Sequence, residues 1–410
     1  MRAGLALALA LLAATAQAAE PPKPGQRFQL APTDLPRPGA TASVANSSQI
    51  IHRTAEMKPQ VPAGFTVTLF AQGLRHARWL AVAPNGDVFL AEPGAGRITV
   101  LRDGDGDGVA EVRETFAEGF ERPHGLAFHN DALYVADTEA VWRLDWRPGR
   151  TRNAEKPKRI TPPGALGEGY GHWTRNLAFH PDGTRFFVAV GSQANIAEEE
   201  APRATVMEFK IDGSGGRVFA SGLRNAVGIA FRPGSADLYV VVNERDGLGD
   251  GLVPDYFTRL VEGGFYGWPY SYIGANPQPN FANRRPDRVA SALVPDLLFR
   301  SHSAPLGLAF NSSESFPPEM KGDAFVALHG SWNSSQPEGY MVVRVPMKDG
   351  KPLGHYEAFA TGFLLGSQGG RPQVWGRPVG LAFDSQGGLL IADDAAQVIW
   401  RVSASRAGRP

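Results

Sequence analysis

The sequence predicts an all-β protein, a six-bladed β-propeller closed by pairing of its N- and C-terminal strands. Three observations support this fold class. A short apolar phrase occurs six times, and each copy is followed by a turn and by a second apolar strand. The first three intervals between copies are each about 50 residues, which is typical of one propeller blade. No window of the 410 residues shows the 3.6-residue periodicity of a long helix.

Each copy of the phrase is small and apolar, as expected for a strand that is buried on both faces. The copies lie at 79–82, 125–128, 176–179, 228–231, 307–310 and 380–383. The two longest intervals are expected to hold loop insertions, at about 243–295 and 331–376. The sixth unit has room for three strands, so we expect the strand at 66–70 to supply the fourth and to remove the open sheet edges. A two-sheet sandwich is the alternative architecture.

The chain divides into four segments. Residues 1–18 carry Arg2, an apolar stretch and a small-residue cleavage site, and they are interpreted as a secretory signal peptide. An N-terminal core helix is the alternative. Residues 19–60 are rich in Pro, Ala and Ser and are expected to form a linker or a surface strap. Residues 61–403 form the predicted propeller, and 404–410 a C-terminal tail. A periplasmic or secreted location follows from this interpretation.

Composition restricts the class of partner. Lys and Arg number 41 and so do Asp and Glu, so no basic field favours nucleic acid. The apolar N-terminal stretch is too short to span a membrane, and we expect no membrane span. The chain has no cysteine and therefore no disulfide, but its length permits a large core without one.

The acidic run at 103–108 fits the calcium-loop pattern D-x-[DN]-x-[DN]-G-x5-E at every fixed position. Gly108 permits the sharp turn, and Glu114 occupies the twelfth position, from which it can bind Ca²⁺ with both oxygens. The expected ligands are the carboxylates of the loop and one backbone carbonyl: Asp103, Asp105, Asp107, Val109, Glu111 and Glu114. Because the flanks are strand-like, we expect a structural calcium loop within a blade. A plain acidic hairpin is the alternative.

Polar side chains stand just before several of the apolar phrases, where the inner strands of a propeller begin. They are His124, His172, Arg224, Asn225 and Arg377. Residues at this position lie at one mouth of the central channel, so we expect the five to converge. A histidine near two arginines indicates a general base that faces an anionic ligand. For any one of them alone, an ordinary surface-loop residue is the alternative.

A third candidate region combines the run 243–250 with the glycine-aromatic run 263–269. Carbonyls between glycines, with carboxylates nearby, can hold a second Ca²⁺, and the aromatic side chains can form the wall of a ligand site. Plain loop packing is the alternative for this composition.

Four motifs, in order along the chain, resemble the soluble glucose/sorbosone dehydrogenase family. They are G-H-W-T-R-N-L-A-F-H-P-D-G at 171–183, G-L-R-N-A-V-G-I-A-F at 222–231, N-E-R-D at 243–246 with L-V-E-G-G-F-Y-G-W-P at 260–269, and G-R-P-V-G-L-A-F at 376–383. The resemblance extends from about residue 61 to 402. It implies a six-bladed propeller that binds pyrroloquinoline quinone (PQQ) over the channel mouth, with Ca²⁺ bridging cofactor and protein.

The resemblance also implies roles for individual residues. His172 falls at the position of the histidine that takes the proton from the sugar's C1 hydroxyl while hydride passes to the quinone. Arg224 and Asn225 match the pair that contacts the quinone, and Arg224 is expected to stabilise the charge of its reduced form. Arg377 matches an arginine that holds the cofactor's carboxylates. The carbonyls of Gly247 and Leu248 match the site of the cofactor's calcium.

The chain departs from the family pattern at three positions. Val379 stands where glucose dehydrogenases have a second arginine, His329 replaces a lysine, and His124 lies where a glutamine is usual. His124 and His329 could compensate for the missing positive charge if they are protonated. This pattern resembles the sorbosone-dehydrogenase branch more than the glucose branch.

These observations predict a PQQ- and calcium-dependent oxidoreductase that acts on a small-molecule aldose or related, sorbosone-like aldehyde. A periplasmic electron acceptor is the expected redox partner. One alternative is a non-catalytic propeller that binds sugar, polymer or a partner protein. Another is a metal-dependent lactonase, which requires carboxylates and Asn around the channel, where this chain instead has His and Arg.

Overall fold

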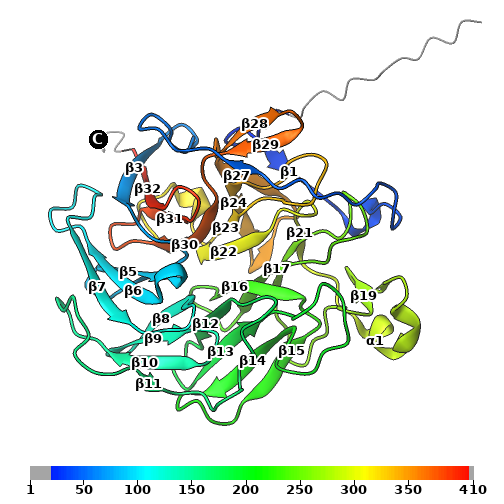
Figure 1. The fold of residues 1–410 in the computed structure, drawn as a ribbon, viewed down its shortest axis with the longest axis horizontal. Coiled ribbons are helices and arrows are strands. Elements are labelled where there is room, and N and C mark those ends of the chain that lie inside the picture. The colour runs from blue at the N-terminus through cyan, green and yellow to red at the C-terminus, as the bar shows by residue number, and fades with distance from the viewer. Residues whose placement is uncertain (1–19, 406–410) are drawn as a thin grey trace, which may run out of the picture.

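The computed structural model describes residues 20–405 and shows an all-β architecture, as predicted. Six sheets of four or five antiparallel strands are arranged around a common centre (Figure 1). The single α-helix of the described residues is α1 (Pro286–Ser291). The predicted signal peptide lies outside the described residues, as does most of the predicted C-terminal tail. Within 20–405, no helix is long and apolar enough to cross a membrane.

Each of the first three sheets runs outward from an inner strand. Sheet one contains β4 (Trp79–Val82), β5 (Val88–Glu92), β6 (Arg97–Arg102) and β7 (Val112–Glu118). Sheet two contains β8 (Gly125–His129), β9 (Ala132–Ala136), β10 (Val141–Asp145) and β11 (Lys158–Arg159). Sheet three contains β12 (Arg175–Phe179), β13 (Arg185–Val190), β14 (Thr205–Lys210) and β15 (Arg217–Ser221).

The last three sheets follow the same plan with additions from distant segments. Sheet four contains β16 (Asn225–Phe231), β17 (Leu238–Asn243), β18 (Tyr256–Arg259) and β21 (Leu297–Leu298). Sheet five contains β22 (Pro305–Phe310), β23 (Ala324–Leu328), β24 (Met341–Val345), β27 (Tyr356–Ala360) and the N-terminal β1 (Arg27–Phe28). Sheet six contains β30 (Pro378–Phe383), β31 (Leu389–Asp393), β32 (Val398–Ala404) and β3 (Phe65–Gln72).

Close packing of the inner strands explains why several copies of the repeated phrase begin with glycine. Neighbouring inner strands contact one another in sequence from β4 to β30, and β30 contacts β4. A Cβ on Gly307 would lie 2.1 Å from the backbone oxygen of Val379, and one on Gly228 would lie 2.5 Å from that of Leu306. No other residue lets two backbones approach this closely.

The apolar core is divided among the interfaces between adjacent sheets. Separate buried clusters lie between sheets one and two, two and three, three and four, four and five, five and six, and six and one. A further small cluster of Val227, Leu306 and Val379 fills the centre. Both faces of each sheet are therefore covered by a neighbour, which is why the inner strands are apolar on both sides.

The N- and C-terminal strands pair as predicted. β3 runs antiparallel to β32, with Thr66 opposite Ser403 and Val67 opposite Val402. This pairing gives sheet six its fourth strand.

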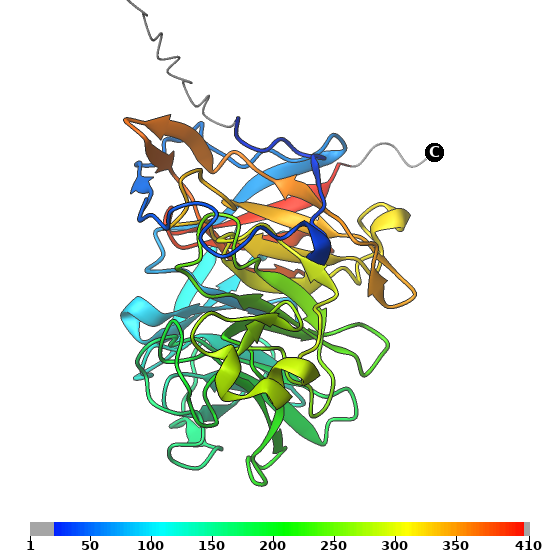
Figure 2. The same cartoon turned by 90° about the vertical axis from the view of Figure 1, so that its right-hand side faces the viewer.

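Residues 20–60 follow the surface of the ring (dark blue in Figure 2). β1 joins sheet five, and β2 (Gln49–Ile50) pairs with β29 (Arg371–Val374), which itself forms a hairpin with β28 (Leu364–Gln368). We call residues 36–51 the strap, because they connect several loops at one end of the ring.

The two predicted insertions are only partly loops. The segment 243–295 contains β18, the pair β19 (Ser271–Tyr272) and β20 (Asn276–Pro277), and α1. The segment 331–376 contains β24, β27, β28 and β29, and the short pair β25 (Met347–Lys348) and β26 (Lys351–Pro352). Short 3-10 turns occupy Pro32–Asp34, Pro93–Ala95, Ala282–Arg284 and Pro318–Met320. The sequence reasoning missed these outer strands because it measured intervals between inner strands alone.

Candidate active site

The candidate site lies at the end of the ring where the inner strands begin. Trp173 connects its parts: the guanidinium of Arg78 lies 5.5 Å from the Trp173 ring, that of Arg122 4.2 Å, and the His124 ring 5.4 Å. His172 is the adjacent residue. The structure therefore brings Arg78, His124 and Trp173, which precede the inner strands of sheets one, two and three, together.

His172 is held in one tautomer. Its Nδ1 lies 2.8 Å from the backbone oxygen of Ser192 and 3.0 Å from the Ser192 hydroxyl. A carbonyl oxygen only accepts, so Nδ1 carries the proton and Nε2 has a free lone pair. Burial lowers the pKa of His172 to about 4, and the positive charge of Arg224 contributes to the shift. The imidazole is therefore neutral at physiological pH and able to accept a proton.

Arg224 is a buried organiser of the loops around His172. Its Nε donates to the backbone oxygen of Asn195 (3.1 Å), and Nη2 to the Asn195 side-chain oxygen (2.8 Å). Nη1 donates to the backbone oxygen of Glu244 (2.7 Å), and Nη2 lies 3.5 Å from the carboxylate of Asp246. Since its donors are directed to protein acceptors, Arg224 acts on the site mainly through its charge and by fixing these loops.

Asp246 connects sheet four to the loop after β23, a role that sequence reasoning missed. Its Oδ1 accepts from the side-chain amide of Asn333 at 2.6 Å and lies 3.7 Å from Nδ1 of His302. Burial alone would raise the pKa of Asp246, but the contacts with His302 and Arg224 lower it below its usual value. Asp246 is thus ionised, and it partly balances the charge of Arg224 beside the base.

A second cluster of polar side chains connects sheets one, five and six. Asp394 accepts from Nη1 of Arg78 at 2.6 Å and from Nε2 of His329 at 3.0 Å. Arg377 donates to the backbone oxygens of His329 (3.0 Å) and Gly330 (2.8 Å). Burial opposes ionisation of Asp394, but contacts with His329 and Arg78 hold its pKa well below the usual value. Sequence reasoning found Arg377 and His329 but not Arg78 or Asp394.

The condition that His124 and His329 be protonated is not met at neutral pH. Burial, followed by the charge of Arg78, lowers the pKa of His124 well below its usual value. Burial and the charge of Arg377 lower that of His329 to about 4, despite the neighbouring Asp394. Neither ring carries charge at neutral pH. Val379, the other departure, is fully buried in the central cluster, where an arginine would lack polar surroundings.

The site retains polar atoms that the protein does not satisfy. Nε of Arg78, Nε2 of His124 and Oδ1 of Asn225 are buried and have no hydrogen-bond partner. His124 Nδ1 donates to the side-chain oxygen of Asn176 at 2.9 Å, so its unpartnered Nε2 is an acceptor. Buried polar atoms of this kind are costly unless a ligand or water bonds to them. The donor on Arg78 and the acceptors on His124 and Asn225 come from three sheets, and together they are suited to a polar ligand at the end of the ring where the inner strands begin.

Gly191 keeps space open in the same place. A Cβ at this position would lie 2.5 Å from Oδ1 of Asn225 and 2.6 Å from Cβ of His172. Glycine therefore allows the candidate base and the unpartnered amide oxygen to lie against one backbone.

The second predicted calcium position is held by the strap. The backbone N–H of Gly39 donates to the Leu248 carbonyl at 2.9 Å. The N–H groups of Gly249 and Asp250 donate to the hydroxyls of Ser43 (3.1 Å) and Thr41 (2.7 Å). The Leu248 oxygen keeps one lone pair beyond this hydrogen bond. The Gly247–Leu248 turn thus lies beside Asp246 in a fixed conformation.

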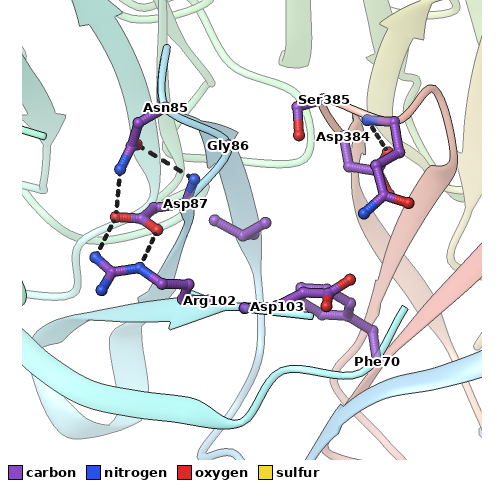
Figure 3. A pocket seen from close by; sticks show the side chains of 11 residues that line it. Phe70, Asn85, Gly86, Asp87, Arg102, Asp103, Asp384 and Ser385 are labelled. Carbon is purple, nitrogen blue, oxygen red and sulfur yellow. Dashed lines mark hydrogen bonds and ion pairs between the residues drawn. The ribbon is translucent and has the colours of Figure 1, made fainter. Parts of the chain in front are cut away.

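The first predicted calcium loop lies at the other end of the ring. β6 runs parallel to β4, so Asp103, which follows β6, lies near the turn after β4, opposite the end where Arg78 lies. A cavity of about 200 Å³ beside it is lined by Asn85, Asp87 and Ser385, and Arg102 binds both oxygens of Asp87 (Figure 3). This loop is therefore remote from His172.

Within the loop, four of the predicted ligands come together. One carboxylate oxygen from each of Asp103, Asp105, Asp107 and Glu111 lies within 4.8 Å of the others. Glu114 is not among them, since it lies in β7 and accepts from the Thr151 hydroxyl (3.1 Å) and Nε of Arg152 (3.4 Å). Val109 has an exposed side chain, and its N–H donates to Asp107.

The structure is thus an all-β ring that carries a neutral histidine and unpartnered buried polar atoms at one end. The chain belongs to the TrAA12-like family, whose model matches residues 59–253 and 276–405. The resemblance to PQQ-dependent sugar dehydrogenases inferred from the motifs is thereby confirmed. The structures described next share its fold.

Three related proteins illustrate the similarity. The pyrroloquinoline quinone-dependent pyranose dehydrogenase of Coprinopsis cinerea is 26% identical over 338 residues, which cover 70% of this chain and 44% of that protein. The structure of its PQQ domain in the holo form has a TM-score of 0.72 at 20% identity, covering 86% of this chain and 98% of that one. This chain thus spans less than half of that enzyme.

The other two are similar in fold. The calcium structure of the Trichoderma reesei Carbohydrate-Active Enzymes Family AA12 protein has a TM-score of 0.70 at 18% identity, covering 88% of this chain and 99% of that one. The PQQ-bound aldose sugar dehydrogenase of Streptomyces coelicolor has a TM-score of 0.57 at 17% identity, covering 84% and 99%.

Proposed function

We propose that the protein is a PQQ-dependent oxidoreductase that oxidises an aldose or a related, sorbosone-like aldehyde, with His172 as general base. The observation that carries the proposal is the fixed tautomer of His172. Its Nδ1 proton is directed to Ser192, its pKa is about 4, and its Nε2 is therefore an available proton acceptor. The six sheets are interpreted as the six blades of a propeller that supports this site.

The chain's own residues supply the acid–base part of the reaction. Nε2 of His172 takes the proton of the substrate hydroxyl while the Ser192 carbonyl stabilises the imidazolium that forms. Arg224 and Asp246 set the charge around the base. When bound, PQQ supplies the two-electron oxidant that protein side chains lack.

Several residues are suited to hold the cofactor. Nε of Arg78 and the guanidinium of Arg377 offer positive charge to its carboxylates, and Arg78 takes the place of the second arginine that Val379 replaces. Oδ1 of Asn225 and Nε2 of His124 offer acceptors. His329 is neutral, and its Nε2 proton is directed to Asp394, so its contribution is to position that carboxylate rather than to add charge.

Calcium enters the proposal at two positions with different roles. The carbonyls of the Gly247–Leu248 turn would hold a cation of the cofactor site, since the strap already keeps this turn in place beside Asp246. The loop with Asp103, Asp105, Asp107 and Glu111 is suited to a cation that stabilises sheet one. A calcium structure of the Trichoderma relative supports calcium in this family.

The signal-peptide interpretation of residues 1–18 supports a periplasmic or secreted location, and with it a periplasmic electron acceptor. The activity test is reconstitution. The mature chain is purified without cofactor, PQQ and Ca²⁺ are added, and dye reduction is followed with aldoses, sorbosone and simple aldehydes. Activity that requires both additions supports the proposal. Absence of PQQ binding would overturn it in favour of a non-catalytic binding protein, and a lactone-hydrolysis assay would then test the remaining alternative.

A further inference from the structure

A second cavity lies beside the candidate site, at the outer edge of sheet three. Its volume is about 380 Å³, and it lies between the segment 198–205, strand β15 and the insertion 265–288. We call it the rim cavity. Its lining includes Glu198, Glu199, Val218, Phe265, Tyr270 and Arg288.

The rim cavity combines aromatic walls with fixed polar groups. The Phe265 and Tyr270 rings lie 6.4 Å apart, and the guanidinium of Arg288 lies 5.3 Å from the Phe265 ring. Trp268 and Pro269 complete this wall. A sugar ring presents apolar C–H faces, which pack on aromatic rings, and hydroxyl edges, which require both donors and acceptors.

The carboxylates in the cavity are held in place before any ligand binds. Glu198 accepts from the Tyr270 hydroxyl at 3.0 Å and from Arg284 at 2.9 Å. Glu199 accepts from the backbone N–H groups of Gln193 and Ala194, both at 2.7 Å. Each oxygen retains further acceptor capacity for ligand hydroxyls. Such preorganised acceptors lose little entropy on binding.

Asn195 connects the wall of the rim cavity to the candidate active site. The backbone oxygen of Asn195 accepts both from Nε1 of Trp268 in the cavity wall (3.0 Å) and from Nε of Arg224 (3.1 Å). Arg203, another wall residue, donates to the backbone oxygens of Gly191 (3.3 Å) and Tyr170 (3.1 Å), which flank His172 along the loops. A ligand in the cavity thus lies beside the loops that fix the base.

We propose that the rim cavity binds a sugar unit of an oligosaccharide, with the reducing end of the same molecule at His172. This inference rests on the proposed sugar-oxidising function and specifies its substrate class as a reducing oligosaccharide. The aromatic wall and the carboxylates recognise the non-reacting unit. Binding in the cavity itself requires neither PQQ nor calcium.

Two exposed valines provide a matched pair of variants. Val218 is 38% exposed and lines the cavity, whereas Val261 is 47% exposed and lies outside its lining. Val218→Trp fills the cavity, and Val261→Trp adds the same ring elsewhere on the surface. Arg288→Ala is a second cavity variant, which removes a donor without adding volume and is used if Val218→Trp does not fold.

Calorimetric titration of the cofactor-free chain with maltotriose, cellotriose and xylotriose tests the cavity alone. We expect at least one trisaccharide to bind, with affinity reduced at least tenfold in Val218→Trp and unchanged in Val261→Trp. Binding of none of the three sugars, or equal binding by both variants, would overturn the inference.

Kinetics of the reconstituted protein then separate the two proposals. We expect Val218→Trp to lower kcat/KM at least tenfold for the bound trisaccharide and to leave that for its monosaccharide unchanged. Equal losses for both sugars would overturn the inference. A third outcome is that the trisaccharide binds, the binding depends on Val218, and no sugar is oxidised. This outcome would support the rim cavity as a sugar-binding site but would overturn the proposed enzymatic function.

Discussion

Nδ1 of His172 lies 2.8 Å from the backbone carbonyl oxygen of Ser192, and this one contact determines which nitrogen can act as a base. Ser192 follows β13, the strand paired with the one that His172 precedes. Sheet three therefore supplies both the histidine and the group that orients it. Removal of the Ser192 hydroxyl would leave the carbonyl contact intact, so Ser192→Ala serves as a mild control for changes at His172.

His172→Ala is expected to reduce kcat of the reconstituted protein by about 10²–10⁴-fold, the usual contribution of a positioned general base. PQQ affinity is expected to change little, because the unpartnered polar atoms belong to other residues. Cofactor titration and steady-state kinetics measure the two effects. Turnover close to that of Ser192→Ala would exclude His172 as the base.

The pH dependence of kcat/KM is expected to have its acidic limb near 4 rather than near 6.5. His172 is active when neutral, and burial with the charge of Arg224 lowers its pKa to about 4. Activity is therefore retained as the pH falls through 6.5 and is lost as the pH falls through about 4.

The Arg224→Gln variant tests whether the positive charge of Arg224 lowers the pKa of His172. Loss of the positive charge stabilises the imidazolium, so the acidic limb is expected to move to higher pH. A limb that stays in place, or moves lower, would contradict the electrostatic role of Arg224.

Arg78→Gln is expected to weaken PQQ binding by about 10–100-fold, because charge-assisted hydrogen bonds contribute about 1.5–3 kcal/mol. Quenching of tryptophan fluorescence by PQQ gives the affinity. Arg217→Gln is the matched control, since Arg217 on β15 pairs with Glu208 on β14 and with Glu262 in the loop after β18. Equal affinity in the two variants would argue against a cofactor role for Arg78.

Calcium removal is expected to lower the melting temperature through the loop at 103–111. A calcium concentration of 100 times Kd stabilises a protein by about 2.7 kcal/mol at one site. Asp105→Asn is expected to lose most of this stabilisation while PQQ affinity stays unchanged, because the loop lies at the opposite end of the ring. Calorimetry with and without Ca²⁺ gives the first quantity. An unchanged melting temperature on chelation would show that the loop is an acidic hairpin.

Gly307→Ala is expected to destabilise the fold by about 1–3 kcal/mol or more, as overpacking of a buried position does. The added Cβ would lie 2.1 Å from the Val379 oxygen, so two inner strands would have to separate. The denaturation midpoint in urea measures the effect. An unchanged midpoint would mean that the inner strands are less tightly packed than the structure has them.

The inner strands were predictable because their signal is local. Phrases such as that at 380–383 are apolar on both faces and begin with the glycine that close packing requires. The same positional rule that found His124, two residues before its anchor, also applies to Arg78 before Leu80, so Arg78 could have been found.

Other features depend on contacts between distant segments. Asp394 matters because it meets Arg78, which is 316 residues away in sequence. The charge states of His124 and His329 could not be settled from the sequence because they depend on burial, which no motif records. The strap contacts the turn at 247–250 through the N–H of Gly39 and the hydroxyls of Thr41 and Ser43, and composition does not indicate where those groups bond.

The pairing of β3 with β32 determines when the ring of sheets can close during protein synthesis. Thr66 and Ser403 bond to each other although 337 positions separate them. During synthesis from the N-terminus, β3 has no pairing partner until β32 has been translated. Contacts of such long range are formed slowly. Ring closure therefore follows the synthesis of β32, and a cofactor that contacts sheets one and six together is captured only after that closure.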